Sequence, residues 1–469
     1  MKFIATFAAA AALLSLAGAA SAQESPALRR IADAAQSLAA GKDPLPGPRT
    51  CFWARGPISG DPYINIAFPD AGTMYWAAVF TVPAGARLAL DGQFPHARFL
   101  SFTTYDGAGK PVESVADYTI KPKAGSTNPF IVGADRTTAQ RAYSLEVVDA
   151  QPSAEGATGM TVAGESREQL HAPKYGNAPG QQIIIMRIYA RDDGRDETAG
   201  VGLPVPVLTL ADGKQLRGAE TCQPLRARQP LLADPAAMAL PIPEFEKLKA
   251  AAAKIAPLYP ATVPPTWHQM LDRESLYGIF TGVPPKEGVK KSEGGFYPNL
   301  DTQYLRTFIN RKIGKVFMIR GKAPTTPKTV HGDAKFGEGE LRYWSMCSQL
   351  GGLADTRVNA CVHDENIPVG PDGFYTIVVS RVADRPRNAY AQCGVAWLPM
   401  SDEGDGTGDT DATQLLLRHQ LGTQGFKQAI QAISKPGAEA QDMGDYFPKG
   451  RYMTPSAFEA ALPCLIEKR

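Results

Sequence analysis

The strongest constraint on the fold of this chain is a pattern that occurs twice. The first occurrence reads Phe68-Pro69-Asp70-x-x-Thr73-x-Tyr75, and the second reads Tyr297-Pro298-Asn299-x-x-Thr302-x-Tyr304. With the same offset, Gly85, Gly92 and Pro95 recur as Gly314, Gly321 and Pro324. A repeat of this length with constant spacing indicates two copies of one domain within the chain.

Each copy contains short segments rich in β-branched and aromatic residues, which turn clusters such as Asp91-Gly92 separate. This pattern is typical of an antiparallel sandwich or barrel. We therefore expect a mainly β fold of tandem duplicated, jelly-roll-like β-sandwich domains with a helical connector and C-terminal helices. The predicted strands are 75–82, 98–105, 143–148 and 182–189 in the first copy, and 303–310, 316–320, 342–348, 374–382 and 394–398 in the second.

The predicted organisation follows from these segments and from changes in composition. A helix is expected over 243–255, where Pro and Glu occupy the first turn and Lys residues follow. Residues 412–433 also resemble a helix, and a final helix is expected to start with Thr454 as N-cap and Pro455 at its first position. The predicted parts are a signal peptide (1–22), an N-terminal helix and linker (23–50), the first sandwich (51–225), a helical, Pro-rich connector (226–290), the second sandwich (291–411) and C-terminal helices (412–469).

The first residues have the form of a secretory signal. Lys2 precedes an apolar run over 3–16, and Ala20-Ser21-Ala22 fits the small-residue cleavage pattern, so we expect cleavage after Ala22. No later run is long and apolar enough to span a bilayer. The expected location is the periplasm or the medium.

Charge and composition argue against nucleic acid as a partner. The 469 residues include 49 Lys or Arg and 47 Asp or Glu, without a basic run. Nucleic-acid-binding domains usually carry a basic face or stripe.

Six cysteines in an exported chain predict three disulfides. Cys347 and Cys361 flank a turn-like segment and would lie opposite each other in a hairpin, at a distance that a disulfide closes. Cys51 and Cys222 would join the ends of the first copy, and Cys393 and Cys464 would tie the C-terminal segment to the second copy. A cysteine-based metal site is disfavoured, because no CxxC occurs.

The segment Asn299-Leu300-Asp301-Thr302-Gln303-Tyr304, followed later by Arg342-Tyr343-Trp344, resembles a known pattern. Bacterial proteins assigned to paired domains of unknown function carry an Asn-x-Asp-Thr-x-Tyr element and a later Arg-Tyr strand. The resemblance implies a β-sandwich-like fold and brings no established activity. The first copy departs from it, since it carries Asp70 and Gly72 where the pattern has Asn and Asp.

The same segments supply the candidate ligand-binding residues. A carboxylate and an arginine with nearby aromatic rings could hold a polar ring by hydrogen bonds and stacking. The alternative is a structural Asp301 that caps its turn and pairs with Arg342. The candidates are Asn299, Asp301, Tyr304, Arg342, Tyr343 and Trp344.

Two further clusters have both a chemical and a structural interpretation. The run His363-Asp364-Glu365 could supply a general base or a metal ligand, but the turn residues around it favour a solvated loop. The acidic, Gly-rich loop 402–411 could hold Ca²⁺, but it lacks the EF-hand order, and a polar loop without an ion is favoured. HExxH, GxSxG and nucleotide-binding glycine motifs are absent, so we predict no metal and no cofactor.

Three functions remain open at this point. The leading hypothesis is an exported envelope protein that binds a glycan or another polar ligand through its second sandwich. A hydrolase or lyase that acts on an envelope polymer is the alternative, if Asp301 and the His363 run converge. A structural or assembly protein is the third hypothesis.

Overall fold

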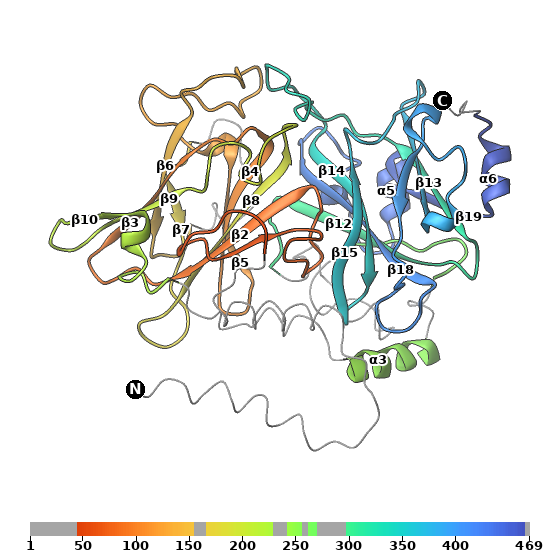
Figure 1. Cartoon of the computed structure of the whole chain (residues 1–469), viewed down its shortest axis with the longest axis horizontal. Coiled ribbons are helices and arrows are strands. Elements are labelled where there is room, and N and C mark those ends of the chain that lie inside the picture. Colours follow the sequence, from red (N-terminus) through yellow and green to blue (C-terminus); the bar gives the residue numbers. More distant parts are fainter. Residues whose placement is uncertain (1–44, 154–165, 228–241, 256–260, 270–296, 465–469) are drawn as a thin grey trace.

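The computed structural model describes residues 45–153, 166–227, 242–255, 261–269 and 297–464. Two β-sandwiches lie side by side, one built from each half of the chain (Figure 1). The predicted mainly β fold and the duplicated sandwich are confirmed. The predicted signal peptide, and residues 23–44 of the predicted N-terminal helix and linker, lie outside the described residues.

The first sandwich has two five-stranded sheets. The first sheet runs in the order β1 (Arg55–Ile58), β2 (Thr73–Phe80), β8 (Gln182–Arg191), β4 (Ala97–Tyr105) and β5 (Pro111–Ala116). The second sheet runs in the order β10 (Gln215–Arg217), β9 (Val205–Thr209), β3 (Arg87–Gln93), β6 (Ala142–Val148) and β7 (Gln169–His171).

The second sandwich repeats this arrangement. Its five-stranded sheet runs in the order β11 (His268–Gln269), β12 (Thr302–Asn310), β18 (Ala412–Gly422), β14 (Leu341–Gly351) and β15 (Asp355–His363). Its four-stranded sheet runs in the order β17 (Ala396–Pro399), β16 (Phe374–Ser380), β13 (Val316–Lys322) and β19 (Lys449–Met453).

The two copies correspond strand by strand. The order β1-β2-β8-β4-β5 matches β11-β12-β18-β14-β15, and β9-β3-β6-β7 matches β19-β13-β16-β17. Even the direction of the edge strand is repeated, because β7 runs parallel to β6 and β17 runs parallel to β16. The sequence repeat is therefore a repeat of the whole sandwich.

Alternating side chains give two buried faces to one sheet of each copy, the sheet that contains β2 in the first copy and β12 in the second. Along β2, Met74 and Trp76 enter the core of the first sandwich, whereas Thr73 and Tyr75 point to its outer face. The outer faces of the sheets that contain β2 and β12 meet in the middle of the molecule (Figure 1). We call this interface the seam.

One prediction about the second sandwich is wrong. Residues 412–433 do not form a helix, because 412–422 are β18, the central strand of their sheet. Leu415 and Leu417 enter the sandwich core, and Gln414 and Arg418 lie on the seam. Both faces are buried, so the usual alternation of apolar and polar residues is blurred. The second sandwich therefore extends beyond residue 411 to β19, and the last segment is not purely helical.

The remaining helices are short. The predicted helix of the connector is confirmed as α3 (Ile242–Ile255), which lies below the second sandwich in Figure 1. The connector also contributes the strand β11 to the second sandwich. The predicted final helix is α6 (Pro455–Ala461), whose Thr454 side chain accepts a hydrogen bond from the Ala457 N–H. The other helical segments are α5 (Glu439–Met443) and the 3₁₀ turns η2 (Asp117–Thr119), η3 (Gly218–Thr221), η5 (Val382–Asp384), η6 (Ala391–Cys393), η7 (Ile430–Ala432) and η8 (Gly444–Tyr446).

The three predicted disulfides are all present. They join Cys51 to Cys222, Cys347 to Cys361 and Cys393 to Cys464. Cys347 and Cys361 are direct partners in the β14–β15 hairpin, as their spacing predicted. A chain with three disulfides is typical of an oxidising compartment.

Membrane spans were sought among the helices that the structure describes, and none combines the length and the apolarity that crossing a bilayer requires.

The disulfides should differ in their contribution to stability. Cys51–Cys222 spans 171 residues and Cys347–Cys361 spans 14. In the chain-entropy account, replacing the pairs with Ser should lower the free energy of unfolding by about 5 and about 3 kcal/mol, respectively. Denaturant unfolding of the two double variants checks this order, and an equal loss in both would contradict it.

Candidate functional site at the seam

Each copy inserts its Pro turn into the outer face of the other copy. Nη2 of Arg418 in the second copy donates to the carbonyl oxygens of Phe68 at 2.7 Å and Pro69 at 3.2 Å. Nη2 of Arg187 in the first copy donates to the carbonyl oxygen of Tyr297 at 3.0 Å. The two arginines are equivalent, because each lies on the central strand of its sheet and beside the first strand of the repeated motif. The exchange is therefore reciprocal.

The same local backbone occurs in both turns. Phe68 and Tyr297 adopt left-handed conformations, with φ of 54° and 43°. This region is costly for bulky side chains, so it persists only where surrounding contacts hold it. The arginine contacts to the carbonyl groups of these two residues supply such a constraint.

The strands that carry the arginines end in matching kinks. Ala190 and Leu421 both have φ of 45°. The Ala190 N–H donates to the Gly72 carbonyl at 3.0 Å, and the Leu421 N–H donates to the Asp301 carbonyl at 2.9 Å. Asp301 and Gly72 therefore occupy equivalent positions, and the same backbone hydrogen bond holds each of them in its turn.

The two turns differ in the side chain that follows proline. Asp70 is fully buried and accepts hydrogen bonds from Ser345 Oγ at 2.5 Å and Tyr343 Oη at 3.1 Å, and it lies 3.8 Å from Nη1 of Arg418. Asn299 instead donates to Tyr189 Oη at 3.4 Å. A carboxylate therefore enters the second copy, whereas a neutral amide enters the first.

Asp301 is a buried acid at the edge of the seam. Its carboxylate accepts a hydrogen bond from Ser114 Oγ at 2.8 Å, and 4 % of the residue is exposed. Burial raises the pKa of Asp301 to about 6, although Ser114 and the charges of Arg187 and Arg342 oppose this. Asp301 thus titrates closer to neutrality than a solvated carboxyl group.

A second buried acid lies near Asp301. Burial raises the pKa of Asp117 to about 7, although the charge of Arg342 and backbone N–H groups act in the opposite direction. Nη1 of Arg342 is 3.2 Å from Asp117, and the Leu100 N–H donates to Asp117 at 2.7 Å. The predicted partner of Asp301, Arg342, is therefore bound to Asp117.

The other predicted site residues divide between two faces of β14. Tyr343 lies on the seam with its ring 5.3 Å from that of Tyr189. Trp344 points to the opposite face and packs in the sandwich core, with its ring 5.0 Å from Tyr375 and 1 % of it exposed. Neighbours along a strand alternate in direction, so Tyr343 and Trp344 cannot form one platform. Asn299, Asp301, Tyr304 and Tyr343 are brought to the seam, and Trp344 is not.

Three glutamines on the seam were missed at the sequence level. Gln349, Gln414 and Gln420 are fully buried, and their side-chain amide atoms have no hydrogen-bond partner among the residues that the structure describes. Gln349 and Gln414 are direct cross-strand neighbours on β14 and β18. Gln420 lies further along β18, beyond Arg418. For β18 the signal was the even spacing of Gln414, Arg418 and Gln420, which Leu416 interrupts and the helical interpretation concealed.

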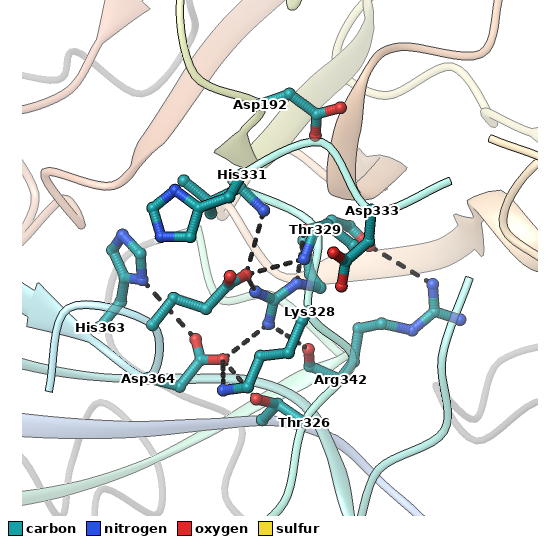
Figure 2. A network of polar contacts seen from close by, with 12 residues as sticks. Asp192, Thr326, Lys328, Thr329, His331, Asp333, Arg342, His363 and Asp364 are labelled. Atoms are coloured by element: carbon teal, nitrogen blue, oxygen red, sulfur yellow. Dashed lines mark hydrogen bonds and ion pairs between the residues drawn. The ribbon is translucent and has the colours of Figure 1, made fainter. Parts of the chain in front are cut away.

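The run His363-Asp364-Glu365 is not a solvated loop. Asp364 and Glu365 receive the buried guanidinium of Arg98 from the first copy, with 2.8 Å between Nη1 and Asp364. Figure 2 shows Thr326, Lys328 and His363 around the Asp364 carboxyl group. Burial opposes ionisation of Asp364, but Arg98 and His363 outweigh it and lower its pKa to about 2. The ion pairs of Arg98 with Asp364 and Glu365 therefore link the first sandwich to the second.

The proposed convergence of Asp301 and His363 has no contact to support it. Nδ1 of His363 lies 3.7 Å from Asp364, while Asp301 is bonded to Ser114. Across the described ranges, no hydrogen bond or ion pair joins Asp301 to His363.

The acidic loop is neutralised by basic side chains. Asp405 lies 3.0 Å from Nζ of Lys249 on α3, and Asp411 lies 2.7 Å from Arg311. Arg357 likewise pairs with Glu403 at 2.6 Å. These carboxylates tie α3 and neighbouring strands to the loop.

Comparisons with known proteins leave the function open. No family model matches the chain, and no curated protein matches it. An uncharacterized protein from Burkholderia cenocepacia has a TM-score of 0.44 at 11% identity, over 84% of this chain and 79% of that one. The VPA0106 protein from Vibrio parahaemolyticus has a TM-score of 0.39 at 12% identity, over 82% of this chain and 90% of that one. Similarity at this level carries no argument about function.

The reciprocal arginines should hold the two sandwiches together. Replacing Arg418 with Met leaves the buried Asp70 carboxylate without its cation, so we expect a loss of about 3–5 kcal/mol. Replacing Arg187 with Met removes hydrogen bonds to Tyr105 Oη and the Tyr297 carbonyl, so we expect a loss of about 1–3 kcal/mol. Unfolding should also separate into two transitions, one for each sandwich. Calorimetry tests both points against Arg387→Met, whose side chain is 90% exposed and whose loss should cost under about 1 kcal/mol. A single transition without loss of stability would contradict this role.

The raised pKa of Asp301 predicts a pH dependence. Folding favours its neutral form, so its contribution to stability is fully present below 3.8 and is lost as the pH rises through about 6. Asp301→Asn should therefore be more stable than the natural protein at pH 8, by up to roughly 3 kcal/mol, with the difference vanishing near pH 4. Denaturant unfolding across this range measures it. Asp212→Asn on an exposed turn is the control, and a difference independent of pH would refute the assignment.

Proposed function

We propose that the second sandwich binds a small polar ligand, such as a fragment of an envelope glycan, at the seam. The observation that supports this most is that Gln349, Gln414 and Gln420, on one face of one sheet, have amides with no partner within the described part of the chain. Each buried polar group without a partner costs about 1–3 kcal/mol. Three such side chains on one face are better explained by a ligand that completes their hydrogen bonds than by chance.

The chemistry of this face suits a hydroxylated ligand. A primary amide offers both donors and acceptors, and so matches hydroxyl groups, which also do both. Tyr304, a partly exposed residue on β12, adds an aromatic ring to this face, with the Arg418 guanidinium 5.8 Å from the ring centre. Ring stacking and paired hydrogen bonds are the means by which proteins hold polar rings.

We further infer that the chain is exported and belongs with the bacterial proteins of paired domains of unknown function. The charged and apolar start of the chain and Ala20-Ser21-Ala22 support cleavage near Ala22, and the three disulfides are consistent with export. The Asn299 to Tyr304 element supports the family. An exported protein of this kind would be released to the periplasm or to the medium.

The unpaired amides should lower the stability of the ligand-free protein and should be required for ligand binding. Gln349→Met and Gln414→Met keep the side-chain volume and remove unpaired atoms, so we expect each to raise the free energy of unfolding by about 1 kcal/mol. Gln182→Met is the matched control, because Gln182 is equally buried but bonds the Ala172 carbonyl at 2.6 Å and the Val82 N–H at 2.9 Å. That variant should lose about 1–3 kcal/mol. Denaturant unfolding gives all three values.

Ligand binding is tested by thermal unfolding of the oxidised, full chain with a panel of oligosaccharides and envelope fragments. A ligand that binds only the native state raises the midpoint. The rise should be absent in Gln349→Met and Gln414→Met and retained in a surface variant such as Asp212→Asn. Destabilisation of both methionine variants, with no rise for any ligand, would overturn the proposal.

A further inference from the structure

The first sandwich carries a cavity on the outer face of the sheet that contains β3, on the side away from the second sandwich (Figure 1). Along β3, Leu88 and Leu90 enter the sandwich core, so Arg87, Ala89 and Asp91 alternate onto the outer face. The cavity has a volume of about 330 Å³. Neighbouring strands add further lining side chains from the same face, which are Ser144, Glu146, Val207, Thr209, Gln215 and Arg217.

The equivalent face of the second copy is apolar and is covered by a helix. Four of its side chains pack with Phe458 of α6, and these are Val316, Met318, Val378 and Met453. Strand pairing gives the corresponding residues of the first copy, which are, in the same order, Arg87, Ala89, Glu146 and Thr209. Two charged groups and a hydroxyl group therefore line the cavity at positions where the second copy binds its own helix.

Two of the charges that line the cavity are not neutralised by the protein. Arg87 is exposed, and its guanidinium makes no hydrogen bond or ion pair with the residues that the structure describes. Glu146 accepts a hydrogen bond from Nε2 of Gln169 at 2.9 Å, and across the described ranges no cation pairs with it. Asp91 differs from them, because Lys123 and Arg217 lie 2.8 Å and 2.9 Å from its carboxylate.

The spacing of these two charges defines the length of a ligand that could bridge them. Ala89 pairs directly with Glu146 across β3 and β6, so Arg87 is the diagonal neighbour of Glu146. Diagonal neighbours in a sheet lie about 7–8 Å apart, and an extended dipeptide spans about 7 Å. Liquid water occupies about 30 Å³ per molecule, so the cavity has room for about ten water molecules, or for one dipeptide.

We propose that this cavity binds a small zwitterion of the size of a dipeptide, with its carboxylate on Arg87 and its ammonium group on Glu146. Charge-assisted hydrogen bonds of this kind are about twice as strong as those between neutral groups. The lining also carries no net charge, because Arg87 and Arg217 balance Asp91 and Glu146. This site is separate from the seam and does not depend on the function proposed for it.

The experiment is a calorimetric titration of the oxidised full chain with alanyl-alanine and two blocked forms of it. N-acetylation removes the ammonium charge of the peptide, and C-terminal amidation removes its carboxylate. Each modification should weaken binding about 10-fold, because each removes hydrogen bonds between charged groups. Equal affinity for the three peptides would overturn the proposal.

Substitutions assign each charge of the peptide to one side chain. Arg87→Gln should bind alanyl-alanine about 10-fold more weakly and should no longer distinguish it from its amide, while it still discriminates against the acetylated form. Glu146→Gln should show the opposite pattern. Arg387→Gln and Asp445→Asn remove exposed charges from the second sandwich and should leave every affinity unchanged. Circular dichroism establishes that each variant is folded before it is titrated.

The remaining outcomes separate this cavity from the seam. Dipeptide binding that is lost in Gln349→Met and kept in Arg87→Gln would place the peptide at the seam and overturn its assignment to the cavity. A natural protein that binds none of the three peptides would also overturn it, and neither result would depend on whether an oligosaccharide binds at the seam.

Discussion

The structure depends on the exchange of buried arginine contacts between its two halves. Arg187 and Arg418 extend from the central strands of facing sheets and bind the backbone of the opposite Pro turn. Peptide carbonyl groups are obligatory hydrogen-bond acceptors, so burying these turns requires donors that the turns themselves lack. A guanidinium supplies several donors in one rigid group. The sandwiches can therefore meet along polar faces without leaving the turns unsatisfied.

Much of the fold could be predicted from the sequence because short segments of the chain, read on their own, indicate it. The repeated Pro-Asp and Pro-Asn turns marked the two copies, and cysteine spacing in the hairpin fixed one disulfide. The strand β18 could not be recognised in the same way. It is covered on both sides, and its polar residues Gln414 and Arg418 are buried by the seam rather than exposed to solvent. For Arg418, the contact with the turn of the other copy explains why a charged residue occurs on this strand.

The candidate site was predictable only in part for a related reason. Asn299, Asp301 and Tyr304 follow one another in a recognisable turn and strand, so sequence alone placed them together. Trp344 was grouped with them by adjacency, although the pleat of the strand directs it into the core. The glutamines reach the site through pairing between distant strands. Such pairings are set by register, which a single sequence does not display.

The internal duplication has a consequence for how the seam can evolve. In a dimer of identical chains, a substitution near the two-fold axis appears on both sides and must be tolerated twice. Here the halves are joined in one chain, so the second copy holds Arg306 where the first has Ala77. Arg187 and Arg418 preserve the near-symmetric arrangement of the two copies, whereas the position of Arg306 and Ala77 differs between them. The two sides of the seam can therefore differ in chemistry, whereas the two sides of an interface in a symmetric dimer of identical chains must be the same.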